Sequence, residues 1–124
     1  MGMNSRITPV YLDMFDSKNS VEEDFEIQIP DTDEILLASY GSWSYDGDAF
    51  VLFRRHIKGE KTRLFEVNGS HCSCYGLEGQ WEPEETTIQA LRFRMKNGRF
   101  GQDEYHKFAN ELTKILDALE GKKK

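Results

Sequence analysis

The sequence is poor in the features that mark several large protein classes. Its 124 residues include two cysteines and three prolines, and two cysteines are too few for the disulfide framework of a small secreted protein. Residues 1–8 lack the apolar core of a signal peptide. The longest apolar stretch, residues 34–40, has the length of a strand, whereas a membrane-spanning helix needs roughly 18–20 apolar residues. We therefore expect a cytoplasmic protein with reduced thiols and no membrane partner.

Motifs of the common catalytic and nucleotide-binding sites are also missing. The chain contains no P-loop, no G-x-G-x-x-G turn, no G-x-S-x-G elbow, no H-E-x-x-H pair and no EF-hand loop. Each of these motifs places a phosphate, a nucleophile or a metal ion by a fixed spacing of side chains. Their absence favours a binding protein over an enzyme.

Negative charge is concentrated near the N-terminus. The chain carries a formal net charge of −6, and residues 11–34 hold nine acidic residues and one lysine. We predict that Glu22, Glu23, Asp24 and Glu26 form an acidic surface that steers the chain onto a basic surface of a partner protein. The alternative is a solvated acidic face without a partner.

The same charge disfavours direct binding to nucleic acid, because an acidic chain repels phosphate. The basic residues that could contact phosphate are few and surround one expected hairpin: Arg54, Arg55, Lys58, Lys61 and Arg63. We interpret them as solvated residues at the tip of that hairpin.

Periodicity in the sequence predicts one α+β domain over residues 1–124. Alternating apolar residues predict an antiparallel sheet of three to four strands. The strands are expected at about residues 34–40, 48–56 and 62–68, with residues 71–75 as the candidate fourth strand. Residues 1–17 follow neither period, and an extended arm or a short helix would both fit them.

Three helices are expected to pack on this sheet, at about residues 20–27, 86–97 and 103–120. Ser20 and Glu23 have the spacing of a capping box, in which two side chains satisfy the first backbone N–H groups of a helix. Thr86 begins a second segment of this kind. In the last segment, apolar residues recur at helical spacing from Tyr105 to Leu119.

A glycine-rich segment precedes the two C-terminal helices. Residues 69–85 lack a helical period, and a loop of this length is often functional. Exposed tryptophan and tyrosine residues dominate protein-binding hot spots. We therefore name four loop aromatics as binding candidates, with core capping as the alternative for each: Trp43, Tyr45, Tyr75 and Trp81.

His71, Cys72 and Cys74 form a cluster of metal-ligating and nucleophilic side chains. In an extended segment Cys72 and Cys74 share a face and His71 points away, so two thiolates could begin a zinc site. A structural zinc needs four ligands, normally from two spaced pairs, and the sequence has no second pair. We therefore expect no cofactor, with zinc as the alternative.

A catalytic cysteine is the other chemical interpretation of this cluster. A nucleophilic thiolate needs a nearby base, and the acidic neighbours Glu78 and Glu82 would raise the pKa of either thiol. With one residue between them, a disulfide joining Cys72 to Cys74 would close a strained ring. Two small, buried thiols are the favoured interpretation.

Residues 66–87, which read EVNGSHCSCYGLEGQWEPEETT, resemble a family of small uncharacterised bacteriophage and prophage proteins. Residues 38–40 and 47–52 are similar as well, and the resemblance spans roughly residues 34–97. The family has no established activity, so no catalytic residue carries over. The resemblance implies a small acidic protein that binds and inhibits a bacterial protein, such as a defence nuclease or a transcription enzyme.

These features together favour a non-enzymatic, phage-type protein that binds and modulates a host protein in the cytoplasm. The alternative is a small metal- or thiol-dependent enzyme that uses Cys72, Cys74 and a histidine. A homodimeric structural module is the third hypothesis, which the mass of the protein in solution would test.

Overall fold

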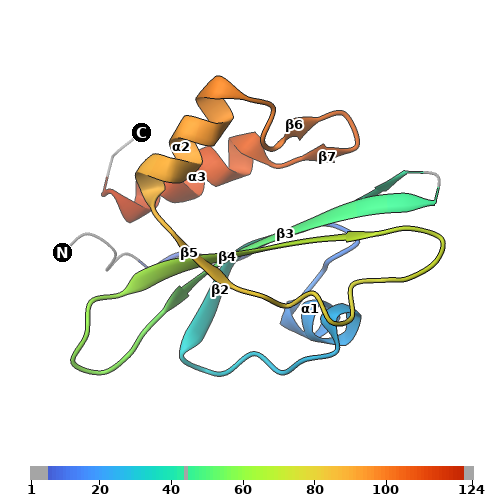
Figure 1. Ribbon diagram of the computed structural model, residues 1–124. Coiled ribbons are helices and arrows are strands. Elements are labelled where there is room, and N and C mark those ends of the chain that lie inside the picture. The colour runs from blue at the N-terminus through green and yellow to red at the C-terminus, as the bar shows by residue number, and fades with distance from the viewer. Residues whose placement is uncertain (1–5, 44, 122–124) are drawn as a thin grey trace.

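The computed structural model describes residues 6–43 and 45–121, and it confirms the predicted α+β fold (Figure 1). A five-stranded sheet, a small two-stranded sheet and three helices make up the described part of the chain. The elements follow in the order β1 (Val10–Asp13), α1 (Lys18–Phe25), β2 (Asp33–Trp43), β3 (Asp46–Arg55), β4 (Arg63–His71), β5 (Glu84–Thr86), α2 (Ile88–Asn97), β6 (Gln102–Asp103), β7 (His106–Lys107) and α3 (Ala109–Leu119).

The main sheet is mixed, whereas the sequence predicted an antiparallel one. Its strand order is β1-β2-β3-β4-β5, and the pairs from β2 to β5 are antiparallel. β1 lies parallel to β2 at the edge of the sheet, with Val10 opposite Leu37. Parallel neighbours need a crossover connection, and α1 lies in that connection. Part of the predicted arm at residues 1–17 is therefore an edge strand, and residues 1–5 lie outside the described residues.

Both faces of the main sheet are covered, which explains the nearly continuous apolar runs of its central strands. α2 and α3 lie over one face, while α1 and the segment that follows β4 lie on the other (Figure 1). The side chains of β3 alternate between the two cores. Val51 and Phe53 pack in the core that contains Phe25 of α1. Phe50 and Leu52 pack in the core that contains residues of α2 and α3.

The first two predicted helices are correct in place, but each N-cap was assigned to the wrong residue. The Oγ atom of Ser17 accepts a hydrogen bond from the backbone N–H of Ser20 at 3.2 Å, and the Oγ atom of Ser20 accepts one from Ser17 at 3.1 Å. Ser17 is therefore the N-cap of α1, and Ser20 lies inside the helix. Thr87 caps α2 by accepting from the N–H of Ala90 at 3.0 Å, while Thr86 ends β5.

The helix predicted at residues 103–120 begins later, at Ala109. Residues 102–107 form the β6–β7 hairpin instead. Gly101 has a left-handed backbone with φ of +73°, and its carbonyl oxygen accepts hydrogen bonds from the N–H groups of Phe108 and Ala109. Phe108 then lies in the core between the sheet and α3. The predicted start was wrong because Tyr105 and Phe108 have the same spacing as the apolar residues of α3, although both residues precede the helix.

The candidate fourth strand at residues 71–75 is a tight turn. Cys72 and Tyr75 form an isolated antiparallel bridge after the end of β4. The strand that pairs with β4 is β5, which comes after the glycine-rich segment. Within residues 6–43 and 45–121, no helix has the length and apolar character needed to cross a membrane.

Candidate functional site

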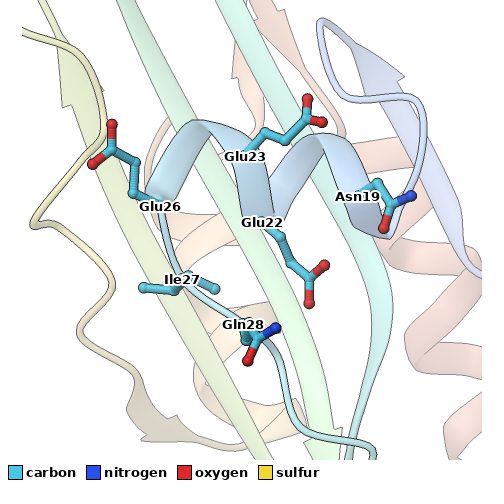
Figure 2. A pocket seen from close by; sticks show the side chains of 6 residues that line it. All are labelled: Asn19, Glu22, Glu23, Glu26, Ile27 and Gln28. Carbon is cyan, nitrogen blue, oxygen red and sulfur yellow. The ribbon is translucent and has the colours of Figure 1, made fainter.

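The four predicted acidic residues lie on and directly after α1, and we call them the acidic helix face: Glu22, Glu23, Asp24 and Glu26. Three of them are exposed, and Glu22 is half-buried. Glu22, Glu23 and Glu26 line a shallow hollow with Asn19, Ile27 and Gln28. Figure 2 shows Glu22 pointing toward Gln28, whereas Glu23 and Glu26 extend away from it.

Glu22 also has a structural role. Its Oε2 atom accepts a hydrogen bond from the backbone N–H of Ile29 at 2.8 Å. Glu26 adopts a left-handed backbone with φ of 60° and ends the helix. The sequence prediction treated the four acids as equivalent, but Glu23 and Asp24 are the ones without a part in ending α1.

The negative charge of the acidic helix face is not neutralised within the described residues. None of its four carboxylates forms an ion pair with a described lysine, arginine or histidine. Partial burial raises the pKa of Asp24, and the neighbouring charge of Glu23 raises it further. This repulsion between adjacent carboxylates would be relieved by a cation brought by a partner.

Arginine side chains elsewhere in the fold are bound to carboxylates of the same chain. Their N–O distances lie between 2.7 and 3.1 Å. The pairs are Arg54–Glu34, Arg55–Asp33, Arg63–Glu85, Arg92–Asp117 and Arg94–Glu66. Three of these arginines belong to the basic group that the sequence placed around one hairpin. Those three cations are engaged within the fold, which further disfavours phosphate binding by this group.

Three of the four predicted aromatic residues lie at one end of the sheet. Trp43 and Tyr45 flank the turn between β2 and β3, and Tyr75 follows the end of β4, where His71 pairs with Gly47. Tyr45 is 75% exposed and Tyr75 is 55% exposed. The fourth, Trp81, is half-buried and packs in a core instead. Its ring centroid lies 5.0 Å from that of Phe25 and 5.9 Å from that of Phe53.

Tyr105 joins this end of the sheet, although the sequence placed it in a helix. It lies in the β6–β7 turn and stacks on Trp43 with a centroid distance of 5.7 Å. Its side chain is 54% exposed. The signal that could have located it is Gly41, because only a residue without a side chain lets β7 approach β2 there. We call Trp43, Tyr45, Tyr75 and Tyr105 the aromatic end.

Exposed carboxylates surround the aromatic end. Asp46 and Asp48 come from the first residues of β3, and Asp103 and Glu104 come from the β6–β7 hairpin. Within the described residues, none of these four forms an ion pair with a lysine, arginine or histidine. The aromatic end therefore combines ring faces with negative charge, a combination that attracts cationic side chains.

A pocket of about 250 Å³ opens between the sheet and the β6–β7 hairpin. Asp48, Asn68, Arg99 and Asp103 line it, together with His106, which is 8% exposed. The Nε2 atom of His106 lies 3.4 Å from the carbonyl oxygen of Ser39. Burial lowers the pKa of His106, so its imidazole is neutral near pH 7. The pocket is a polar site beside the β6–β7 hairpin that carries Tyr105 of the aromatic end.

The cysteines lie in the turn Cys72-Ser73-Cys74-Tyr75, which we call the thiol turn. Cys74 is exposed and Cys72 is half-buried, so the interpretation of two buried thiols was wrong. The buried residue of the glycine-rich segment is Leu77 instead. No group of three or more histidine, cysteine or carboxylate side chains in the described part of the chain could hold a metal ion.

His71 points away from the thiols, as alternation along a strand predicts. Its Nδ1 atom lies 2.7 Å from the Oη atom of Tyr40, and its ring covers Gly47. The Sγ atom of Cys72 instead accepts a hydrogen bond from the backbone N–H of Cys74 at 3.3 Å. That bond lowers the pKa of the Cys72 thiol, and the nearby charge of Asp46 only partly opposes it. The expectation that acidic neighbours dominate this pKa was wrong.

Comparisons of this chain with protein-family models, with curated proteins and with solved structures found no match.

Proposed function

We propose that this chain is a non-enzymatic, phage-type protein that binds a bacterial host protein with a basic surface and thereby modulates or inhibits it. One observation carries the proposal: the arginines named above pair inside the fold, whereas the acidic helix face has no ion pair among the described residues. A folded chain that pairs five of its arginines internally, and leaves the acidic helix face without an ion pair among the described residues, is suited to meet a positive surface.

The aromatic end supplies a second contact region of the kind that anchors protein partners. Tyrosine and tryptophan bury large areas with little loss of conformational freedom, and they are enriched among hot-spot residues. Tyr45 is the most exposed of the large hydrophobic side chains described. The carboxylates around it would pair with basic residues of the same partner, so both regions favour one class of target surface.

The first test is capture of a partner from bacterial lysate by the intact chain and by a variant with Glu23→Gln, Asp24→Asn and Glu26→Gln. Glu22 is retained because it binds the backbone N–H of Ile29. We expect the wild type to retain one stoichiometric host protein. For that purified partner, the variant should associate about tenfold more slowly at low salt, and this difference should shrink as salt is added.

A matched control removes the same charge elsewhere, through Glu60→Gln, Glu82→Gln and Glu84→Gln at exposed positions. This control should associate at nearly the wild-type rate. The acidic-docking proposal is wrong if both triple variants associate equally fast. The binding-protein proposal itself is wrong if no host protein is retained in stoichiometric amount by the wild type.

The aromatic end is tested separately by Tyr45→Ala. Truncation of a hot-spot tyrosine weakens binding by at least about 2 kcal/mol, so the dissociation rate of the partner should rise by more than tenfold. Phe93→Ala is the control, because Phe93 is 66% exposed but lies on α2. Equal effects of the two substitutions would show that the aromatic end has no special part in binding.

A small thiol-dependent enzyme is the second candidate, and the hydrogen bond to the Cys72 sulfur is the observation that favours it. The candidate has less support because His71, the nearest base in the sequence, is bound to Tyr40. Cys72→Ser separates the two functions. Partner binding that survives this substitution supports the leading proposal, whereas loss of a measured turnover in the folded variant would support the enzyme.

A further inference from the structure

The thiol turn brings two sulfur atoms together at the surface by its backbone geometry. The N–H of Cys72 donates to the carbonyl oxygen of Tyr75 at 3.1 Å and closes a two-residue loop. Neither Ser73 nor Cys74 has positive φ, so the loop is not one of the primed turns that match the twist of paired strands. The pairing accordingly stops after one bridge.

The side chain of Cys72 folds back over this turn. Its Sγ atom accepts the N–H of Cys74 at 3.3 Å, which is the position that an Asx or ST side chain takes in such turns. Interaction with the nearby Cys74 side chain also lowers the pKa of the Cys72 thiol. Hydrogen bonds to a sulfur stabilise its thiolate. Both interactions therefore favour the thiolate, which is the form that attacks disulfides.

Solvent can reach both thiols. Cys74 is exposed and Cys72 is half-buried. His71 is turned toward Tyr40 on the other side of the strand end. Leu77, two residues after the turn, is buried and fixes the following segment against the core. The thiol turn is thus a dithiol within reach of solvent.

We propose that Cys72 and Cys74 form a redox-active dithiol that exchanges with small-molecule disulfides, with Cys72 as the attacking thiol and Cys74 as the resolving thiol. The Cys72 thiolate attacks one sulfur of the disulfide, forms a mixed disulfide and releases one thiolate. The Cys74 thiolate then attacks the Sγ atom of Cys72 and releases the second. The pair is oxidised by two electrons, and the small disulfide is reduced to two thiols.

The turn makes this bridge attainable and also makes it easy to reduce. In a strand, Cα atoms two residues apart are separated by about 6.6 Å, close to the upper limit for a disulfide. The turn at Ser73 and Cys74 bends the chain out of this extended geometry, and the Cys72 sulfur lies 3.3 Å from the Cys74 nitrogen. The ring remains small and strained, and strained, exposed disulfides are the labile ones. The bridge is therefore suited to reversible oxidation.

The test exposes the reduced wild-type protein to oxidised glutathione and follows intact mass over time. The expected product has lost two hydrogen atoms per chain, is monomeric, and returns to the starting mass with dithiothreitol. The Cys74→Ser variant should instead accumulate one glutathione adduct on Cys72. The Cys72→Ser variant should react about tenfold more slowly near pH 7, because Cys74 lacks the backbone donor that Cys72 has.

Circular dichroism and urea unfolding of both variants verify that the fold is retained, which is expected because serine is close in size to cysteine and neither position is fully buried. Three results would overturn the proposal: two stable glutathione adducts on the wild type, a disulfide-linked dimer in place of the internal bridge, or equal rates for the two single variants. Capture of the host protein by the Cys72→Ser variant is measured separately. A failure of thiol exchange can therefore be distinguished from a failure of the proposed binding function.

Discussion

Gly41 shows how one missing side chain positions a whole hairpin. A Cβ atom at this residue would overlap the carbonyl oxygen of Tyr105 and lie 3.1 Å from the Cα atom of His106. Both neighbours are backbone atoms and cannot rotate away. Gly41→Ala should therefore lower the free energy of unfolding by about 1–3 kcal/mol, as measured by urea denaturation. It should also loosen the stacking of Tyr105 on Trp43, visible as a change in tryptophan fluorescence.

Gly76→Ala is the matched control for Gly41→Ala. The nearest atom to its added Cβ is the Oε1 atom of Glu78 at 2.9 Å, which is the end of a flexible, exposed side chain. The free energy of unfolding should change by no more than about 0.5 kcal/mol. Similar losses at the two glycines would contradict the close approach of β7 as the cause.

His106 gives the protein a pH dependence whose sign follows from burial. Burial lowers its pKa in the folded state, against the charges of Asp13, Asp48 and Asp103, and Arg99 lines the same pocket. In the unfolded chain a histidine titrates near about 6.5. Below that pH the unfolded state takes up a proton that the folded state resists, so stability falls on acidification.

The measurement compares urea unfolding at pH 7.5 and pH 5.5. The free energy lost between the two pH values should be smaller in His106→Gln than in the wild type. An unchanged pH dependence in His106→Gln would show that another group causes it.

At the scale of elements, α1 depends on its N-cap. Ser17→Ala removes the acceptor for the N–H of Ser20, and loss of such a cap destabilises a protein by about 1 kcal/mol. We expect a drop of this size in the free energy of unfolding. Asn19→Ala is the control, because Asn19 is exposed within the same helix. A loss at Ser17 no larger than that at Asn19 would contradict the assigned cap.

Sequence reasoning located the interiors of the elements better than their ends. The spacing of Ser20 and Glu23 predicts an N-cap at Ser20, whereas the N-cap is Ser17 and its capping-box partner is another serine, Ser20. Tyr105 fits a helical period by position alone, and only the contact with Gly41 shows that a hairpin precedes α3. Local patterns do not contain these long-range contacts, so they cannot fix such boundaries.

Some residues of the candidate site could be predicted from the sequence, and others could not. Surface acids such as Glu23 could be predicted, because charge is a property of the sequence and charged residues stay at the surface. Trp43 and Trp81 looked alike as loop aromatics, yet Trp81 packs on Phe25 in the core. The exposure of Cys74 was likewise hidden, because burial of a loop residue depends on which neighbour, here Leu77, enters the core.

At the scale of the whole molecule, ion pairs join the two C-terminal helices to each other and to the sheet. Arg92 of α2 binds Asp117 of α3 at 2.8 Å, and Arg94 of α2 binds Glu66 of β4 at 2.7 Å. These pairs place carboxylates and arginines of the C-terminal half against each other. The acidic helix face has no such ion pair among the described residues, so its negative charge stays available to a partner.

From the Arg94–Glu66 pair we predict a change in the stability of the whole fold. Burial alone would raise the pKa of Glu66, but hydrogen bonds from Arg94 and Asn68 outweigh it and hold the pKa below its usual value. Arg94→Met leaves a carboxylate that is 5% exposed without its cation. The free energy of unfolding should fall by about 1–3 kcal/mol at pH 7. Lys96→Met, at an exposed position of the same helix, should have little effect.

The dependence of this loss on pH distinguishes a lost charge pair from lost packing. In the wild type, the contribution of Glu66 is present above the unfolded pKa of about 4.3 and is lost as the pH falls through the lower folded value. In Arg94→Met, protonation removes the unpaired charge of the buried Glu66 carboxylate and therefore stabilises the folded state. The stability difference between the two proteins should therefore narrow from pH 7 to pH 4 in urea unfolding. A difference that stays constant over this range would mean that Arg94 acts through the packing of its side chain, because packing does not titrate.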